Sequence, residues 1–222
     1  MSNTTLSAIP PNVKQILQMY GAYASGVVEA HYQPLYSMLA YPSAGQANFS
    51  FFTSGSTPAT LNTTNLPGNG GQLPSPINYL ILGVEVIFKS GLTPGSIVTT
   101  SGETAADDYY AAIDNDVGYF ELKIGTKPYL QVAPLSALGE SDSPTYNVAL
   151  SASTTESATS INNVAGNFVP ARQSAGITPL LLKSNESFYV TITYPGGKVA
   201  LPSGKAGVIG VRLNGYQYQN AQ

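Results

Sequence analysis

One apolar segment, residues 78–88, constrains the fold of this chain more than any other stretch. Its sequence, NYLILGVEVIF, is the longest apolar run and is rich in β-branched and aromatic residues. At a period of two, one face carries Leu82, Val84, Val86 and Phe88, and the other carries Ile81, Gly83, Glu85 and Ile87. About 11 residues are too few for a membrane-spanning helix. Because both faces are largely apolar, we expect this strand in the middle of a sheet, at the centre of a β-sandwich core.

The chain carries unusually little charge for its size. Only 9% of its 222 residues are Asp, Glu, Lys or Arg, whereas globular proteins average about 25%. Ser, Thr, Asn, Gly and 15 Tyr take the place of charged residues. Because protein–protein interfaces are depleted in charge at their centres and enriched in Tyr, this composition favours a protein that acts within an assembly. A secreted or salt-tolerant surface rich in Ser and Thr is the alternative interpretation.

Several classes of function receive no support from the composition. The net charge is −3, so the basic footprint of a nucleic-acid-binding protein is missing, and we expect no direct sequence-specific nucleic-acid binding. The absence of cysteine removes disulfides and thiolate metal sites. The first residues lack the basic and apolar regions of a signal peptide, and no apolar run reaches the length of a transmembrane helix. We therefore expect a protein that is made in the cytoplasm and is not secreted.

Residues 13–31 are predicted to form the one helix of the chain. Asn12 is a favourable N-cap, Gln15 follows it as in a capping box, and Pro34 ends the helical pattern. The apolar stripe of this helix consists of Val13, Ile16, Leu17, Tyr20, Tyr23, Ala24 and Val27. Two internal glycines weaken the helix, so it needs a surface to pack against. We interpret residues 1–44 as an N-terminal arm and residues 45–222 as a separate β-domain.

The rest of the chain alternates short β-type segments with turn signals. Strands are expected at 47–53, 78–88, 96–100, 109–113, 117–124, 127–133, 146–151, 178–183, 187–194 and 207–218. The Asp-Asn-Asp sequence at 114–116 is expected to turn a hairpin between two of them. Residues 54–76 and 151–167 are predicted to be long surface loops. Roughly eight to ten strands without interleaved helices are typical of an all-β sandwich or jelly roll.

Residues suited to catalysis are few. His31 is the only histidine and has no accompanying nucleophile motif, so we interpret it as a residue at the C-terminal end of the predicted helix, where a cation is favoured. The acidic residues gather at Glu103, Asp107, Asp108, Asp114 and Asp116. Paired carboxylates would suit a glycosidase and an Asp-rich turn would suit calcium, but neither set has the ligands that its chemistry requires. We therefore predict no enzyme activity, no cofactor and no metal.

Two further sequence segments lie within this weakly charged β-domain, one before the long apolar strand and one in the last predicted strand. Gly71-Gln72-Leu73-Pro74 runs toward the long apolar strand, and the last predicted strand reads VIGVRLNGY over residues 208–216. Together with the N-terminal helix and the Tyr-rich β-domain, they make the whole chain resemble the jelly-roll major capsid proteins of tailless icosahedral phages and archaeal viruses, many of which enclose a membrane. Many members have two fused jelly rolls, whereas about 175 residues after the arm suit one. The resemblance implies a single jelly roll of about eight strands after an N-terminal α-helix.

The resemblance also implies a structural role in a virion. The chain would be a non-enzymatic coat protein that self-assembles into trimeric capsomers and, with other capsid proteins, into an icosahedral shell. Residues 13–31 would face the particle interior or an internal lipid membrane, and the two long loops would face outward or lie between subunits. The residues expected to contact a subunit or membrane are Ile16, Leu17, Tyr20, Tyr23, Ala24 and Val27. A carbohydrate-binding β-sandwich of a spike or adhesin, with exposed Tyr stacking on sugars, is the alternative.

Overall fold

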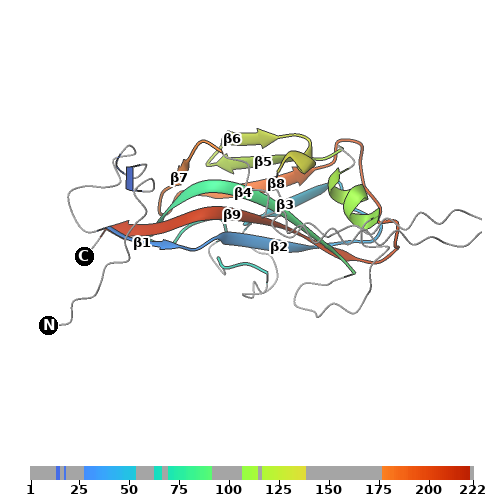
Figure 1. Cartoon of the computed structure of the whole chain (residues 1–222), viewed down its shortest axis with the longest axis horizontal. Helices are drawn as coiled ribbons and strands as arrows, with labels where there is room; N and C mark the ends of the chain where they lie inside the picture. Colours follow the sequence, from blue (N-terminus) through green and yellow to red (C-terminus); the bar gives the residue numbers. More distant parts are fainter. Residues whose placement is uncertain are drawn as a thin grey trace, which may run out of the picture.

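Two antiparallel sheets form the body of the molecule in a computed structural model (Figure 1). The structure describes residues 14, 15, 18, 28–53, 63–66, 70–91, 107–114, 117–138 and 177–220. Sheet A contains β1 (Val28–Tyr32), β2 (Leu35–Tyr41), β4 (Asn78–Ser90), β7 (Leu180–Leu182) and β9 (Gly207–Asn220). Sheet B contains β3 (Asn48–Phe51), β5 (Tyr119–Ile124), β6 (Lys127–Val132) and β8 (Phe188–Thr193). The predicted all-β sandwich class is confirmed.

Strand β9 holds sheet A together, because three other strands pair with it. β4 pairs with β9 on one side over most of its length, and β1 and β2 follow one another along the opposite side. Tyr32 of β1 faces Tyr216, and Leu35 of β2 faces Leu213. Pro34, which has no N–H to donate, lies between the two strands and interrupts the ladder.

The strands pair in a nested order. β2 pairs with β9, β3 with β8, β4 with β7 and β5 with β6, each antiparallel. The first and last strands of this series, β2 and β9, therefore lie side by side. Within the series, only β5 and β6 are both consecutive in the sequence and paired in a sheet. Sheet A runs in the order β2-β9-β4-β7 and sheet B in the order β3-β8-β5-β6.

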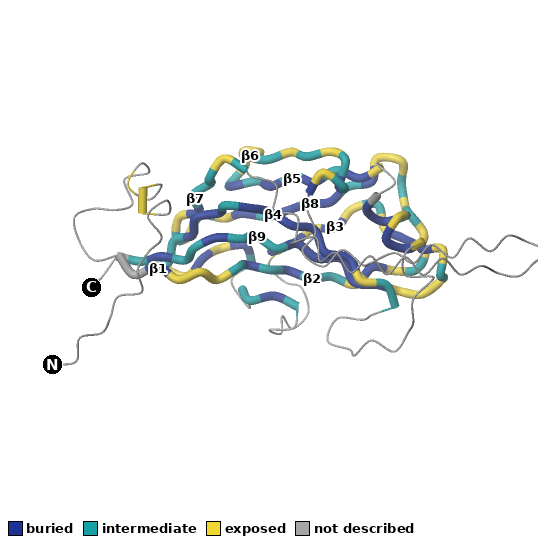
Figure 2. Tube along the Cα trace, viewed as in Figure 1, coloured by how far each residue is buried: buried dark blue, intermediate teal, exposed yellow. Residues whose placement is uncertain are grey.

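The core lies between the inner faces of the two sheets, and aromatic rings fill one end of it. The Tyr41 ring stacks on Phe49 with centroids 5.0 Å apart and meets Phe88 edge-on at 5.4 Å. Buried phenols satisfy their O–H groups on backbone carbonyls: Tyr41 donates to Val199 at 2.7 Å and Tyr79 to Leu213 at 2.7 Å. Figure 2 shows β4 buried along most of its length, whereas the edge strand β6 is largely exposed.

The long apolar strand is β4, and a bulge changes the faces that its sequence predicts. The register with β9 shifts between Ile81 and Gly83, so Leu82 is the extra residue. Ile81 consequently joins Val84 and Val86 in the inter-sheet core, which corrects its predicted place on the opposite face. Ile87 lies on the outer face and is nevertheless fully buried. The expectation that this strand is central and apolar on both faces is therefore confirmed.

The N-terminal prediction needs a correction. Residues 28–31, expected at the end of the 13–31 helix, form most of strand β1 and pair with β9, so the helix prediction is wrong there. β1 and β2 lie within the range assigned to the arm, but both belong to sheet A. Of the preceding residues the structure describes Lys14, Gln15 and Gln18, which are helical and exposed. The remaining residues of the predicted stripe lie outside the described part of the chain.

The segment predicted as a strand at 109–113 is also helical. Residues 107–109 begin a short helix that continues as the π-helical turn η1 (Tyr110–Asp114), at the end of the sandwich opposite β1 (Figure 1). The hairpin is formed instead by β5 and β6, and Gly125, with a φ of 60°, occupies their turn. Short apolar runs do not distinguish helix from strand, which explains the error. Strands expected at 96–100 and 146–151 lie outside the described residues.

We expect Gly215→Ala to destabilise the fold. A Cβ on Gly215 would lie 1.9 Å from the Leu80 carbonyl oxygen, so β9 and β4 would have to separate beside the bulge. The cost should be about 2 kcal/mol in the free energy of unfolding, as for other overpacking substitutions. Urea denaturation measures it. Gly196→Ala is the matched control, because a Cβ there has nothing within 4 Å; equal stability of the two variants would contradict the prediction.

Alkaline pH should unfold the protein through its buried tyrosines. Burial raises the pKa of Tyr41 to about 12 and also raises the pKa values of Tyr79 and Tyr194 above the usual value for a tyrosine, about 10. Their contribution to stability is therefore fully present below about pH 10 and is lost as the pH rises toward the folded-state pKa. Parallel circular dichroism and tyrosinate absorbance should show these residues ionising together with unfolding. In Tyr41→Phe the decline of stability with pH should be shallower; an unchanged decline would refute the assignment.

Candidate interaction surfaces

The residues expected to contact a subunit or membrane do not define a site in the described structure. Ile16, Leu17, Tyr20, Tyr23, Ala24 and Val27 all lie outside the described residues, so their role stays a prediction. In the described part of the chain, no helix has the length and apolar character needed to cross a membrane.

The acidic residues divide between a buried position and the surface. Asp108 is fully buried and Asp107, its neighbour, is exposed. The Asp108 carboxylate accepts hydrogen bonds from the Ser203 backbone N–H at 2.9 Å, from the Ser203 hydroxyl at 2.6 Å and from the Ser90 hydroxyl. These bonds tie the helical segment at 107–114 to the end of β4 and to the loop before β9. The carboxylate oxygens of Asp108 therefore accept hydrogen bonds from within the protein, which gives this residue a structural role.

The other candidate catalytic and metal residues are not assembled into a centre by the described structure. His31 lies on β1 opposite Gln217 and is exposed, so its predicted place at a helix end is wrong. Glu103, Asp116 and the Asp114 side chain are outside the described residues. Among the side chains that are described, no three His, Cys, Asp or Glu residues come together to hold a metal ion.

A cluster of tyrosines and paired polar groups occupies the outer face of sheet A, and we call it the tyrosine patch. Its members are Tyr32 on β1, Glu85 on β4, and Arg212, Asn214 and Tyr216 on β9. The Tyr32 and Tyr216 rings meet edge-on with centroids 5.6 Å apart. Tyr32 is 61% exposed and forms the outward part of the patch.

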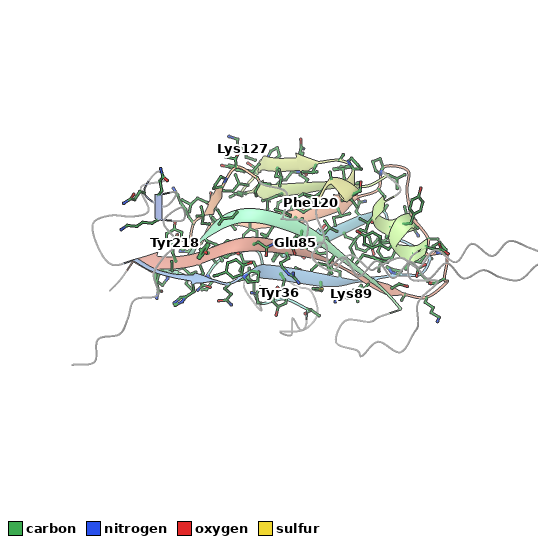
Figure 3. All side chains as sticks on the ribbon, viewed as in Figure 1. Tyr36, Glu85, Lys89, Phe120, Lys127 and Tyr218 are labelled. Atoms are coloured by element: carbon green, nitrogen blue, oxygen red, sulfur yellow. The ribbon has the colours of Figure 1, made fainter. Side chains whose placement is uncertain are left out.

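A hydrogen-bonded chain fixes the polar members of the patch. Glu85 is 6% exposed, and its carboxylate accepts from Arg212 Nη1 at 3.1 Å and from Asn214 Nδ2 at 2.7 Å. The Tyr32 hydroxyl lies 3.4 Å from Asn214 Oδ1, to which it donates. Figure 3 labels Glu85 on β4 and Tyr36 on β2, the residue that faces Arg212 across the ladder. The Arg212 guanidinium balances the charge of the Glu85 carboxylate, so this pair adds no net charge to the patch.

The outer face of sheet B has a different chemistry. Asn48 faces Thr193 and Ser50 faces Thr191, so four short polar side chains form a block on β3 and β8, which we call the hydroxyl face. Beyond Thr191 on the next strand, Glu121 pairs with Lys123 at 2.6 Å and accepts from Gln131 at 2.6 Å. The hydrogen bond from Lys123 is the main cause that lowers the pKa of Glu121. This ion pair is balanced, and the four residues of the hydroxyl face are uncharged.

The sequence indicated some of the residues of the tyrosine patch. The alternation of β9 separates Arg212 and Asn214 from core residues such as Val211. Glu85 was visible as the one charged residue in an apolar strand. What the sequence did not reveal is that these residues meet, because Glu85 and Arg212 are 127 positions apart and their contact depends on which strands pair.

We expect Asp108→Asn to destabilise the protein, whereas Asp107→Asn should not. An amide at position 108 replaces one acceptor oxygen with an N–H₂ donor, which would face the hydroxyl and N–H donors of Ser203 and Ser90. The loss should be about 1–3 kcal/mol of unfolding free energy, typical of a buried polar group left without its partner. Thermal and urea denaturation of both variants measure this difference in stability. If the two proved equally stable, the structural role of Asp108 would be refuted.

Comparisons with known proteins do not extend these observations. No protein-family model, no curated protein and no solved structure matches the chain.

Proposed function

We propose that the chain is a structural subunit of a viral coat, a single jelly-roll protein that self-assembles into capsomers of an icosahedral shell. On this proposal it has no catalytic role. Its partners are further copies of itself, in trimeric capsomers, and other coat proteins.

The nested strand pairing is the observation that carries the proposal. Pairing of β2 with β9, β3 with β8, β4 with β7 and β5 with β6 is the connectivity expected when one long hairpin is rolled into two facing sheets. Eight-stranded jelly rolls of this kind serve as viral capsid domains, as lectins and as cupins. The fold alone does not distinguish among these roles, so the choice between them depends on the chemistry of the surface.

The surface favours assembly over the other roles. Each of the two outer faces carries an ion pair, Glu85–Arg212 on sheet A and Glu121–Lys123 on sheet B. A capsid subunit must bury a large part of its surface against neighbours, and the centres of protein interfaces are depleted in charged residues. The low charge content of the chain, 9%, agrees with this role.

Carbohydrate binding through stacked tyrosines receives less support. The exposed tyrosines of the described structure are Tyr32 on β1, Tyr110 on η1 and Tyr129 on β6. Figure 1 places these elements at opposite ends and in different layers of the sandwich, so the three rings do not form one platform.

We expect the purified protein to form capsomers or shells visible by negative-stain electron microscopy at high protein concentration. A truncation lacking residues 1–27 should keep the sandwich, because it leaves β1 and β2 in place. If the N-terminal segment makes a subunit contact, the truncated chain should stop at smaller species in light scattering while keeping its circular dichroism. A full-length protein that stayed strictly monomeric and showed no ordered particles would refute the proposed function.

A further inference from the structure

Strand β1 is attached to sheet A by its pairing with β9, at one end of the sandwich (Figure 1). Its five residues pair with residues 216–220 of β9. The Tyr32 ring also meets Tyr216, and the Tyr32 hydroxyl donates to Asn214, which is again a residue of β9. None of the β1 side chains that the structure describes belongs to the core between the sheets. The position of β1 therefore depends on the edge that β9 offers beyond β2.

The link between β1 and β2 consists of two residues, Gln33 and Pro34, and does not turn back. Both strands pair along the same side of β9, one after the other. A residue before proline favours an extended backbone, which keeps Gln33 from folding β1 onto β2. From Pro34 onward the chain is anchored in its own copy, because the Pro34 carbonyl accepts from Asn65 Nδ2 at 2.7 Å and Leu35 lies in the core. The link thus fixes where β1 starts but not which copy of β9 it joins.

The described part of the surface offers no single apolar area for a contact between copies. Its exposed large hydrophobic side chains are Tyr32, Tyr110, Val117 and Tyr129, which lie on or beside four different elements. The centres of protein interfaces are more apolar than the rest of the surface, and these scattered side chains do not form such a centre. Addition of a strand to a sheet edge instead derives its affinity from main-chain hydrogen bonds.

Resting on the proposed self-assembly, we propose that β1 is exchanged between copies, so that β1 of one copy pairs with residues 216–220 of β9 in the next copy. The pairing seen within one copy is then reproduced between two, together with the Tyr32–Tyr216 contact and the bond from the Gln33 N–H to the Gly215 carbonyl at 3.3 Å. The exchange therefore costs little beyond the joining of the copies, and the high effective concentration within an assembly offsets that cost. A reciprocal exchange gives a two-fold dimer, and an exchange passed from copy to copy closes a ring.

A pair of opposed cysteines tests the exchange in a chain that has no cysteine of its own. His31 on β1 faces Gln217 on β9; His31 is exposed and Gln217 is half-buried. Directly opposed residues of an antiparallel pair lie close enough for a disulfide. After assembly and oxidation, most chains of His31→Cys/Gln217→Cys should run as dimers or larger species on a denaturing gel without reductant. Glu121→Cys/Gln131→Cys is the matched control and should run as a monomer, because these side chains meet across the β5–β6 hairpin of one chain.

A mixture of the two single variants separates exchange from accidental contact. When His31→Cys and Gln217→Cys chains assemble together, they should form disulfide-linked dimers, because their cysteines face each other only where β1 joins the β9 of another copy. Each single variant assembled alone should form none. Circular dichroism of all variants should match that of the wild type.

The outcomes separate this inference from the proposed function. If the assembled double variant contains only internal disulfides, or if the mixture of single variants gives no dimers, the exchange is refuted and self-assembly stands. A stable dimer linked through residues 31 and 217 that never builds capsomers or shells would support the exchange and refute the coat-protein role. A strictly monomeric protein with an internal disulfide would refute both.

Discussion

The pairing of β9 with three other strands is the interaction on which the rest of the structure depends. β9 joins β4 on one side and β1 and β2 on the other, so without it sheet A would separate into pieces. Its inward residues, including Val211 and Leu213, supply the core, and its outward Arg212 and Asn214 supply the tyrosine patch. Alternation at a period of two thus makes one strand responsible for both the stability of the fold and the chemistry of the surface.

Sequence reasoning succeeded where the pattern was local. β4, β8 and β9 were predicted nearly to their ends, because each combines β-branched or aromatic residues with turn signals on both sides. It failed at residues 28–31, where an apolar spacing compatible with a helix continues into a segment that β9 recruits into a sheet. It failed again at 109–113, which lies in a helical segment, because a short apolar run does not distinguish a helix from a strand.

The candidate surfaces were only half predictable. The composition predicts an assembling protein, which stays a prediction, and Glu85 stood out as the charged residue of an apolar strand. The bulge at Leu82 could not be foreseen, and it moves every residue before it to the other face of β4. The meeting of Glu85 with Arg212 follows from register, which depends on pairing between segments more than a hundred positions apart. The sequence contains such long-range information, but periodicity does not reveal it.

The nested order of strand pairing has a consequence for how the chain folds during its synthesis. β2 is among the first strands of the sandwich to be synthesised, and its partner β9 is the last, so sheet A cannot close until nearly the whole sandwich has left the ribosome. Folds dominated by distant contacts form slowly and leave strand edges open meanwhile. A truncated or stalled product would lack β9, and with it the strand that supplies Arg212, Asn214 and Tyr216. Because of this topology, only a chain that has been synthesised through β9 can complete the tyrosine patch.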